Sequence, residues 1–134
     1  MGQLASIDKA LGNSFDSCVL LYGREFYLLE IRRWLLERAG FRVCSTTDAA
    51  EVAHMILFER PQHLVVCHTI PDKEVQEVLE AAHTLRPTMS NLILETTRSM
   101  RSLAEKDRVL SIFAGSRVML DVLIADVNAA APPN

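Results

Sequence analysis

The residues best suited to chemistry stand at the end of one apolar run, His63-Leu64-Val65-Val66-Cys67-His68. The run is typical of a short strand that is covered on both faces and leads into a loop. Cys67 is a possible nucleophile, because a nearby cation such as Arg24 would lower the pKa of its thiol. His68 is a poor base for it, since consecutive side chains of a strand point to opposite faces. A buried, inert cysteine is therefore the favoured interpretation.

The other candidate ligands form no motif. Cys18, Cys44 and Cys67 are an odd number of cysteines without metal-ligand spacing, which indicates free thiols in a reducing compartment. The four histidines show no zinc-protease or similar pattern, so we expect no metal site. The N-terminus lacks the apolar stretch of a signal peptide, and no apolar run approaches the ~20 residues of a membrane span. We therefore expect a cytoplasmic protein that does not bind membranes.

Arg24 has two possible roles. It could bind an anion at the mouth of the sheet, or it could pair with a local carboxylate. Glu25, Asp72 and Glu95 are the candidate partners, and the ion pair is favoured. The net charge of −3 and the isoelectric point near 5.8 argue against a general nucleic-acid binder.

The elements that must position these residues alternate along the chain. Strands are predicted over 18–22, 41–45, 91–95 and 109–113, and a further strand is predicted around the run 64–66, ending at Cys67. Helices are predicted over 25–39, 48–60, 72–86, 99–107 and 117–129. The first helix is expected to turn Leu28, Ile31, Leu35 and Ala39 inward and to leave Trp34 partly buried. Thr47 or Asp48 is expected to cap the second helix, and Asp48 and Glu51 are spaced as a capping box.

Short connections and right-handed crossovers favour an α/β, flavodoxin-like, doubly wound fold. We expect a five-stranded parallel sheet of order 2-1-3-4-5, with the first and last helices on one face and the other three on the opposite face. At 134 residues one domain is expected. It spans 17–129, after an N-terminal extension (1–16) and before a tail (130–134) that contains two prolines and should fray.

From residue 18 to about 129 the chain resembles a CheY-like response-regulator receiver domain of two-component signalling. The passage Ala39-Gly40-Phe41-Arg42-Val43 and the block from Pro61 to Ile70-Pro71 carry the resemblance. In that family an acidic pair after the first strand and an aspartate ending the third strand hold Mg²⁺. The aspartate accepts a phosphoryl group from a histidine kinase. A Thr or Ser ending the fourth strand and a Lys after the fifth contact the phosphoryl oxygens.

The sequence departs from this pattern at most of these positions. Gly23 and Arg24 stand where the resemblance places the acidic pair, and Cys67, four residues before Pro71, stands at the phosphoacceptor position. Ala114 and Gly115 replace the region of the lysine, and only Thr96 matches the switch hydroxyl. Mg²⁺ binding is therefore expected to be lost, with no other cofactor. The resemblance implies a degenerate pseudo-receiver of a phosphorelay, not an enzyme, that acts by protein–protein interaction.

Two alternatives stay open, a flavodoxin-like small-ligand module and a thiol-redox module using Cys67. The first lacks a glycine-rich phosphate loop, and the second lacks an identifiable base. A signalling protein or a second copy of the chain is the expected partner. The predicted contact face consists of the fourth helix, fifth strand and fifth helix, because Val118 and Met119 lie beyond the inward stripe. Phe113 lies where receiver domains carry a switch aromatic.

Overall fold

A computed structural model describes residues 17–95, 107–111 and 116–130. Its strands are β1 (Cys18–Tyr22), β2 (Arg42–Thr46), β3 (His63–Val66), β4 (Ser90–Glu95) and β5 (Asp107–Ser111). They form one sheet of order β2-β1-β3-β4-β5, and every neighbouring pair is parallel. The predicted fold and strand order are confirmed.

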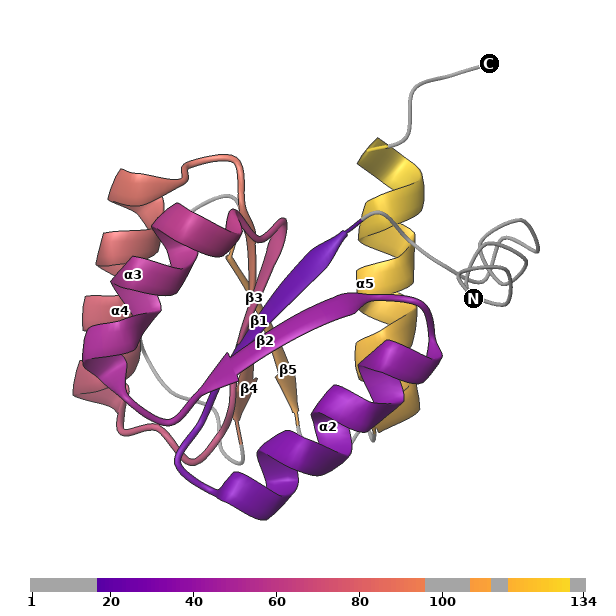
Figure 1. The fold of residues 1–134 in the computed structure, drawn as a ribbon, viewed down its shortest axis with the longest axis horizontal. Coiled ribbons are helices and arrows are strands. Elements are labelled where there is room, and N and C mark those ends of the chain that lie inside the picture. Colours follow the sequence, from indigo (N-terminus) through magenta and orange to yellow (C-terminus); the bar gives the residue numbers. More distant parts are fainter. Residues whose placement is uncertain (1–16, 96–106, 112–115, 131–134) are drawn as a thin grey trace, which may run out of the picture.

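Four helices cover the sheet in the described part of the chain. They are α2 (Phe26–Arg38), α3 (Ala49–Glu59), α4 (Asp72–Leu85) and α5 (Ser116–Ala130). Figure 1 shows α3 and α4 on one face and α2 and α5 on the other, as predicted. The helix predicted over 99–107 falls largely outside the described residues, and Asp107 begins β5 instead. Ala130, predicted as the first tail residue, is the last residue of α5.

The extension 1–16, residues 131–134, Thr96, Phe113, Ala114 and Gly115 also lie outside the described part of the chain, so their predicted roles are untested. No helix in the described ranges is long and apolar enough to span a bilayer.

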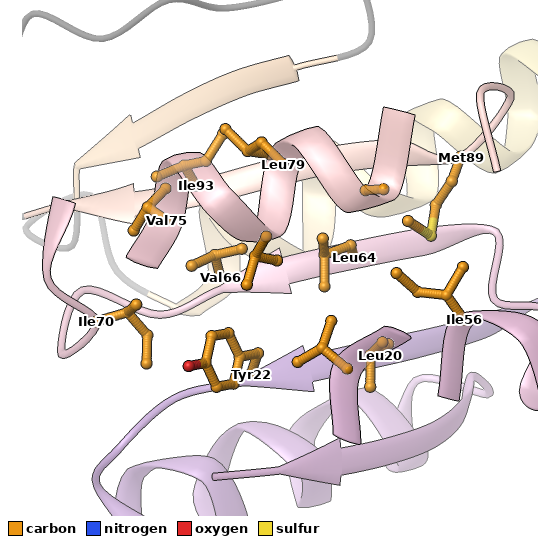
Figure 2. Packing of buried hydrophobic residues seen from close by; sticks show 13 residues of the cluster. Leu20, Tyr22, Ile56, Leu64, Val66, Ile70, Val75, Leu79, Met89 and Ile93 are labelled. Carbon is orange, nitrogen blue, oxygen red and sulfur yellow. The ribbon is translucent and has the colours of Figure 1, made fainter. Parts of the chain in front are cut away.

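The sheet is buried on both faces, because alternate side chains of each strand enter different cores. Leu20 and Tyr22 point toward α3 and α4, where they pack with Ile56, Leu64 and Leu79 (Figure 2). Val19 and Leu21 point the opposite way, into the cluster that includes residues of α2 and α5. This double burial explains why the central strands β1 and β3 read as nearly continuous apolar runs rather than as alternating ones.

The orientation of α2 differs from the prediction. Leu29 and Leu36 are its buried residues, whereas Ile31 is 55% exposed and Trp34 is 54% exposed. Apolar side chains occur all around this helix, so the sequence periodicity does not select one face. Contacts with the sheet select it, and they leave an apolar surface toward solvent.

The start of α3 is capped nearly as predicted. Asp48 is the N-cap, and its Oδ1 accepts a hydrogen bond from the backbone N–H of Ala50 at 2.9 Å. In a capping box the Glu51 side chain would accept a hydrogen bond from the Asp48 N–H. Here the Asp48 N–H donates instead to Thr46 Oγ1 at 3.0 Å. The Thr46 hydroxyl in turn donates to Glu51 at 2.8 Å.

A buried carboxylate at the start of the edge strand β5 joins three elements. The Asp107 side chain is 0% exposed. Asn91 Nδ2 donates to its Oδ1 at 2.8 Å, and His83 Nε2 lies 2.9 Å from the same oxygen. These contacts link β5 to β4 and α4, so the short fifth strand is anchored at its first residue.

The basis of the predicted contact face is partly wrong. Met119 is 2% exposed and lies in the core with Leu123, because α5 turns this stripe toward the sheet. Val118 and Val109 remain partly exposed there.

Candidate functional site

The candidate site lies at the carboxyl ends of β1 and β3. These strands pair in parallel, with Tyr22 opposite Val66, so the residues that follow each strand are neighbours. The Cys67 N–H donates to the Tyr22 carbonyl at 2.8 Å, and the Gly23 N–H donates to the Thr46 carbonyl at 3.3 Å. The structure therefore brings together Gly23 and Cys67, as the sequence predicts.

Gly23 and Cys67 are packed so closely that no side chain fits between them. A Cβ atom on Gly23 would stand 2.9 Å from Cys67 Cβ, 3.2 Å from its Sγ and 3.3 Å from Leu29 Cδ2. Cys67 points into the core on the side of α2. The absence of a side chain at position 23 thus allows Cys67 to fill this edge of the sheet.

Cys67 has the character of a core residue. Its side chain is 2% exposed, and burial raises the pKa of its thiol, although the nearby Arg32 guanidinium acts in the opposite direction. The thiol is therefore protonated at neutral pH and is a weak nucleophile. These properties argue against the thiol-redox alternative at Cys67.

Arg32 is a cation of this site that the sequence analysis missed. It lies on α2 between the two buried residues of that helix, three positions after Leu29. Burial, followed by the charge of Arg32, lowers the pKa of His68, so Arg32 acts on both residues that end the β3 run. Its position on the inward side of α2 could be recognised only once the buried face of the helix was known.

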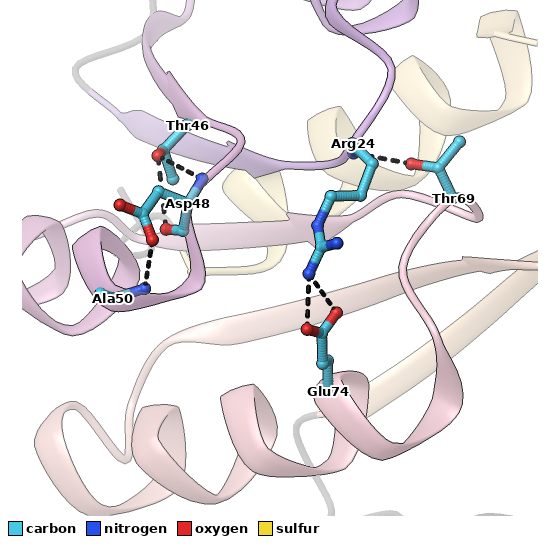
Figure 3. A network of polar contacts seen from close by, with 6 residues as sticks. All are labelled: Arg24, Thr46, Asp48, Ala50, Thr69 and Glu74. Carbon is cyan, nitrogen blue, oxygen red and sulfur yellow. Dashed lines mark hydrogen bonds and ion pairs between the residues drawn. The ribbon is translucent and has the colours of Figure 1, made fainter.

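The Arg24 side chain extends toward α4. Its guanidinium forms an ion pair with both oxygens of Glu74, and its backbone N–H donates to Thr69 Oγ1 at 2.9 Å (Figure 3). The Tyr22 hydroxyl and the Glu74 carboxylate both raise the pKa of Arg24. The favoured ion pair is present, but its partner is Glu74 rather than the three predicted carboxylates. The first turn of α4 carries Glu74 to this point.

The donors at this edge do not suit Mg²⁺. Magnesium prefers oxygen ligands in a near-octahedral arrangement, and here a glycine, an arginine and a buried thiol stand at the strand ends. Glu74, the carboxylate found beside them, is paired with Arg24. In the described ranges, no three His, Cys, Asp or Glu side chains gather closely enough to hold a metal ion.

Solved structures share this architecture. A CheY-like response regulator receiver domain protein from Methanospirillum hungatei superposes with a TM-score of 0.75 at 23% identity, over 84% of this chain and 94% of that one. The signal receiver domain of a putative Luxo repressor protein from Vibrio parahaemolyticus gives 0.72 at 15% identity, over 87% and 93%. This chain has the receiver-domain fold.

A putative pilus assembly-related protein from Burkholderia pseudomallei has the same fold, with a TM-score of 0.65 at 19% identity over 88% of this chain and 94% of that one. No protein-family model matches the sequence, and no curated protein matches it significantly. At sequence identities this low, the similarity to these structures shows a shared fold and nothing more. The chemistry of the site therefore has to be argued from its own residues.

Proposed function

We propose that this chain is a degenerate receiver of two-component signalling, one that accepts no phosphoryl group and acts by binding another protein. The packing of Gly23 against Cys67 carries the proposal. These two residues occupy positions at which a receiver needs a carboxylate nucleophile and an acidic ligand of its metal, and their contact leaves no room for a larger side chain at position 23.

Without the carboxylates and the lysine of a receiver, the barrier to phosphoryl transfer should be high. Phosphoryl transfer depends on positioning and on charge stabilisation by metal and cationic groups. Removing one preorganised stabilising group typically costs about 3 kcal/mol of barrier, and such losses combine, though not additively. The nearby cations do not compensate. Arg24 is paired with Glu74, and Arg32 lies behind a protonated thiol.

An exposed apolar surface supports a binding role. Phe26, Tyr27, Ile31 and Trp34 of α2 are all more than half exposed, and Arg38 lies over the Trp34 ring at 4.7 Å. Clustered apolar side chains on a surface are typical of protein contact sites. Among the residues that the structure describes on the face formed by β5 and α5, the exposed large apolar side chains are the smaller Val109 and Val118. We therefore favour the α2 surface for the signalling partner over the face predicted from the sequence.

Acyl-phosphate treatment tests the chemical half of the proposal. The protein is incubated with Mg²⁺ and acetyl phosphate, and its intact mass is measured. We expect no gain of a phosphoryl group, and a receiver with an intact acidic site serves as the positive control. A stoichiometric gain that disappears in Cys67→Ala would overturn the proposal.

A further inference from the structure

Two thiols touch at the end of the sheet opposite to Gly23 and Cys67. Cys18 is the first residue of β1, and Cys44 lies within the edge strand β2. Arg42 is the register partner of Cys18, and Leu20 is that of Cys44, so the two cysteines occupy diagonal positions on the same face of the sheet. Their Sγ atoms are 3.9 Å apart.

The pair is accessible from one side and has thiolate character. Cys18 is 1% exposed, whereas Cys44 is only partly buried, so Cys44 is the member of the pair nearer to solvent. The hydrogen bond with Cys44 lowers the pKa of Cys18 to about 7, helped by Arg42 and opposed by burial, and the same contact raises the pKa of Cys44. Because the thiolate is the nucleophilic form, this contact favours reaction of the pair with an oxidant.

We propose that Cys18 and Cys44 form a redox-active pair that a hydroperoxide oxidises to an intramolecular disulfide. One sulfur, as the thiolate, attacks the O–O bond, becomes a sulfenic acid and releases an alcohol or water. The second thiol then displaces the hydroxyl group as water and forms the S–S bond. The two thiols supply the two electrons that reduce the peroxide. Cys18 and Cys44 lie away from Gly23 and Cys67, so this reaction does not depend on the proposed function.

Closing the bond requires movement in the sheet. The sulfurs must approach from 3.9 Å to about 2.05 Å, and diagonal positions on neighbouring strands are further apart than a relaxed disulfide prefers. Cys18 begins its strand and β2 is an edge strand with a neighbour on one side only, so a local shift of β2 along β1 is the movement that the sheet resists least. The Cys18 N–H bond to Gln62 Oε1, 2.7 Å long, would be disturbed. A strained disulfide is readily reduced, so the oxidation should be reversible.

Cys67 provides an internal comparison. It lies in the other core cluster, is buried and has a raised thiol pKa. The full chain is treated with hydrogen peroxide, unfolded and alkylated with N-ethylmaleimide. We expect three alkylated cysteines before treatment and one, Cys67, after it, with a loss of two hydrogens in the intact mass. Dithiothreitol should restore three.

Two variants separate the possible outcomes. Cys67→Ser should still lose two reactive thiols, whereas Cys44→Ser should form no intramolecular bond. Peptide mapping of the wild-type chain identifies the linkage without relying on either variant. Three alkylated thiols after treatment, a linkage through Cys67, or a disulfide only between two molecules would each overturn the proposal.

Discussion

At the scale of single residues, Gly23 is the position that decides the chemistry of this edge. A Cβ there would overlap Cys67 Cβ at 2.9 Å, so we expect Gly23→Ala to reduce the free energy of unfolding by about 1–3 kcal/mol. Urea denaturation measures the change. In a Cys67→Gly background the overlap is gone, and the same substitution should cost at least ~1 kcal/mol less. Equal costs in the two backgrounds would show that the contact does not limit this site.

His63 gives a second residue-scale prediction, on pH. Burial lowers the pKa of this histidine, and its ring packs edge-on against Phe41 with the ring centres 6.0 Å apart. The unfolded chain takes up the proton near pH 6.5, before the folded chain does. The contribution of His63 to stability is therefore complete above about pH 6.5 and is lost as the pH falls toward the folded-state pKa.

The measurement is the free energy of unfolding between pH 7 and pH 5. It should fall for the wild type and fall less steeply for His63→Leu, which cannot be protonated. Identical slopes for the two proteins would contradict this explanation.

At the scale of elements, Asp107 anchors β5. Replacing this buried, hydrogen-bonded carboxylate leaves Asn91 and His83 without their partner, so Asp107→Ala should cost about 3 kcal/mol. Arg108→Ala on the same strand is the matched control. Arg108 is half exposed, and its partner Asp126 is 11% exposed, so losing this ion pair should cost about 1 kcal/mol, less than losing the Asp107 contacts.

Hydrogen exchange of the β5 amides, together with urea denaturation, distinguishes these two variants. Asp107→Ala should speed exchange along β5, and Arg108→Ala should not. Comparable losses of stability for both variants would show that the anchor is not at Asp107.

At the scale of the whole molecule, the location of the exposed apolar side chains predicts where a partner binds. Trp34 is half exposed on α2, so Trp34→Glu should leave the free energy of unfolding within about 0.5 kcal/mol of the wild type. Tryptophans that become buried when a partner binds are frequent hot spots of interfaces. The same change should therefore weaken self-association or partner binding at least tenfold. Analytical ultracentrifugation and partner titration measure this.

Val118→Glu is the counterpart on α5. Since Val118 is also partly exposed, the variant should remain folded and should bind as the wild type does. If Val118→Glu weakens association and Trp34→Glu has no effect, the partner binds the face predicted from the sequence and not the α2 surface.

The sequence by itself determined the sheet and the absence of carboxylates at positions 23, 24 and 67. Continuous apolar runs fixed β1 and β3, and the spacing of Val75, Val78, Leu79 and Ala82 fixed the buried face of α4. The identities of Gly23 and Cys67 were sufficient to show that carboxylates are missing, because the strand ends of a parallel sheet meet at one edge.

Only the tertiary structure decided what these residues contact. The rotation of α2 was undetermined, since apolar side chains surround it, and Arg32 stayed unnoticed for that reason. Arg24 found Glu74, 50 residues away, because α4 begins beside the end of β1. The contact between Cys18 and Cys44 depends on the register of two strands, and a shift of one residue would turn one thiol to the opposite face of the sheet. Contacts between distant segments are set by register and helix rotation, and local spacing specifies neither.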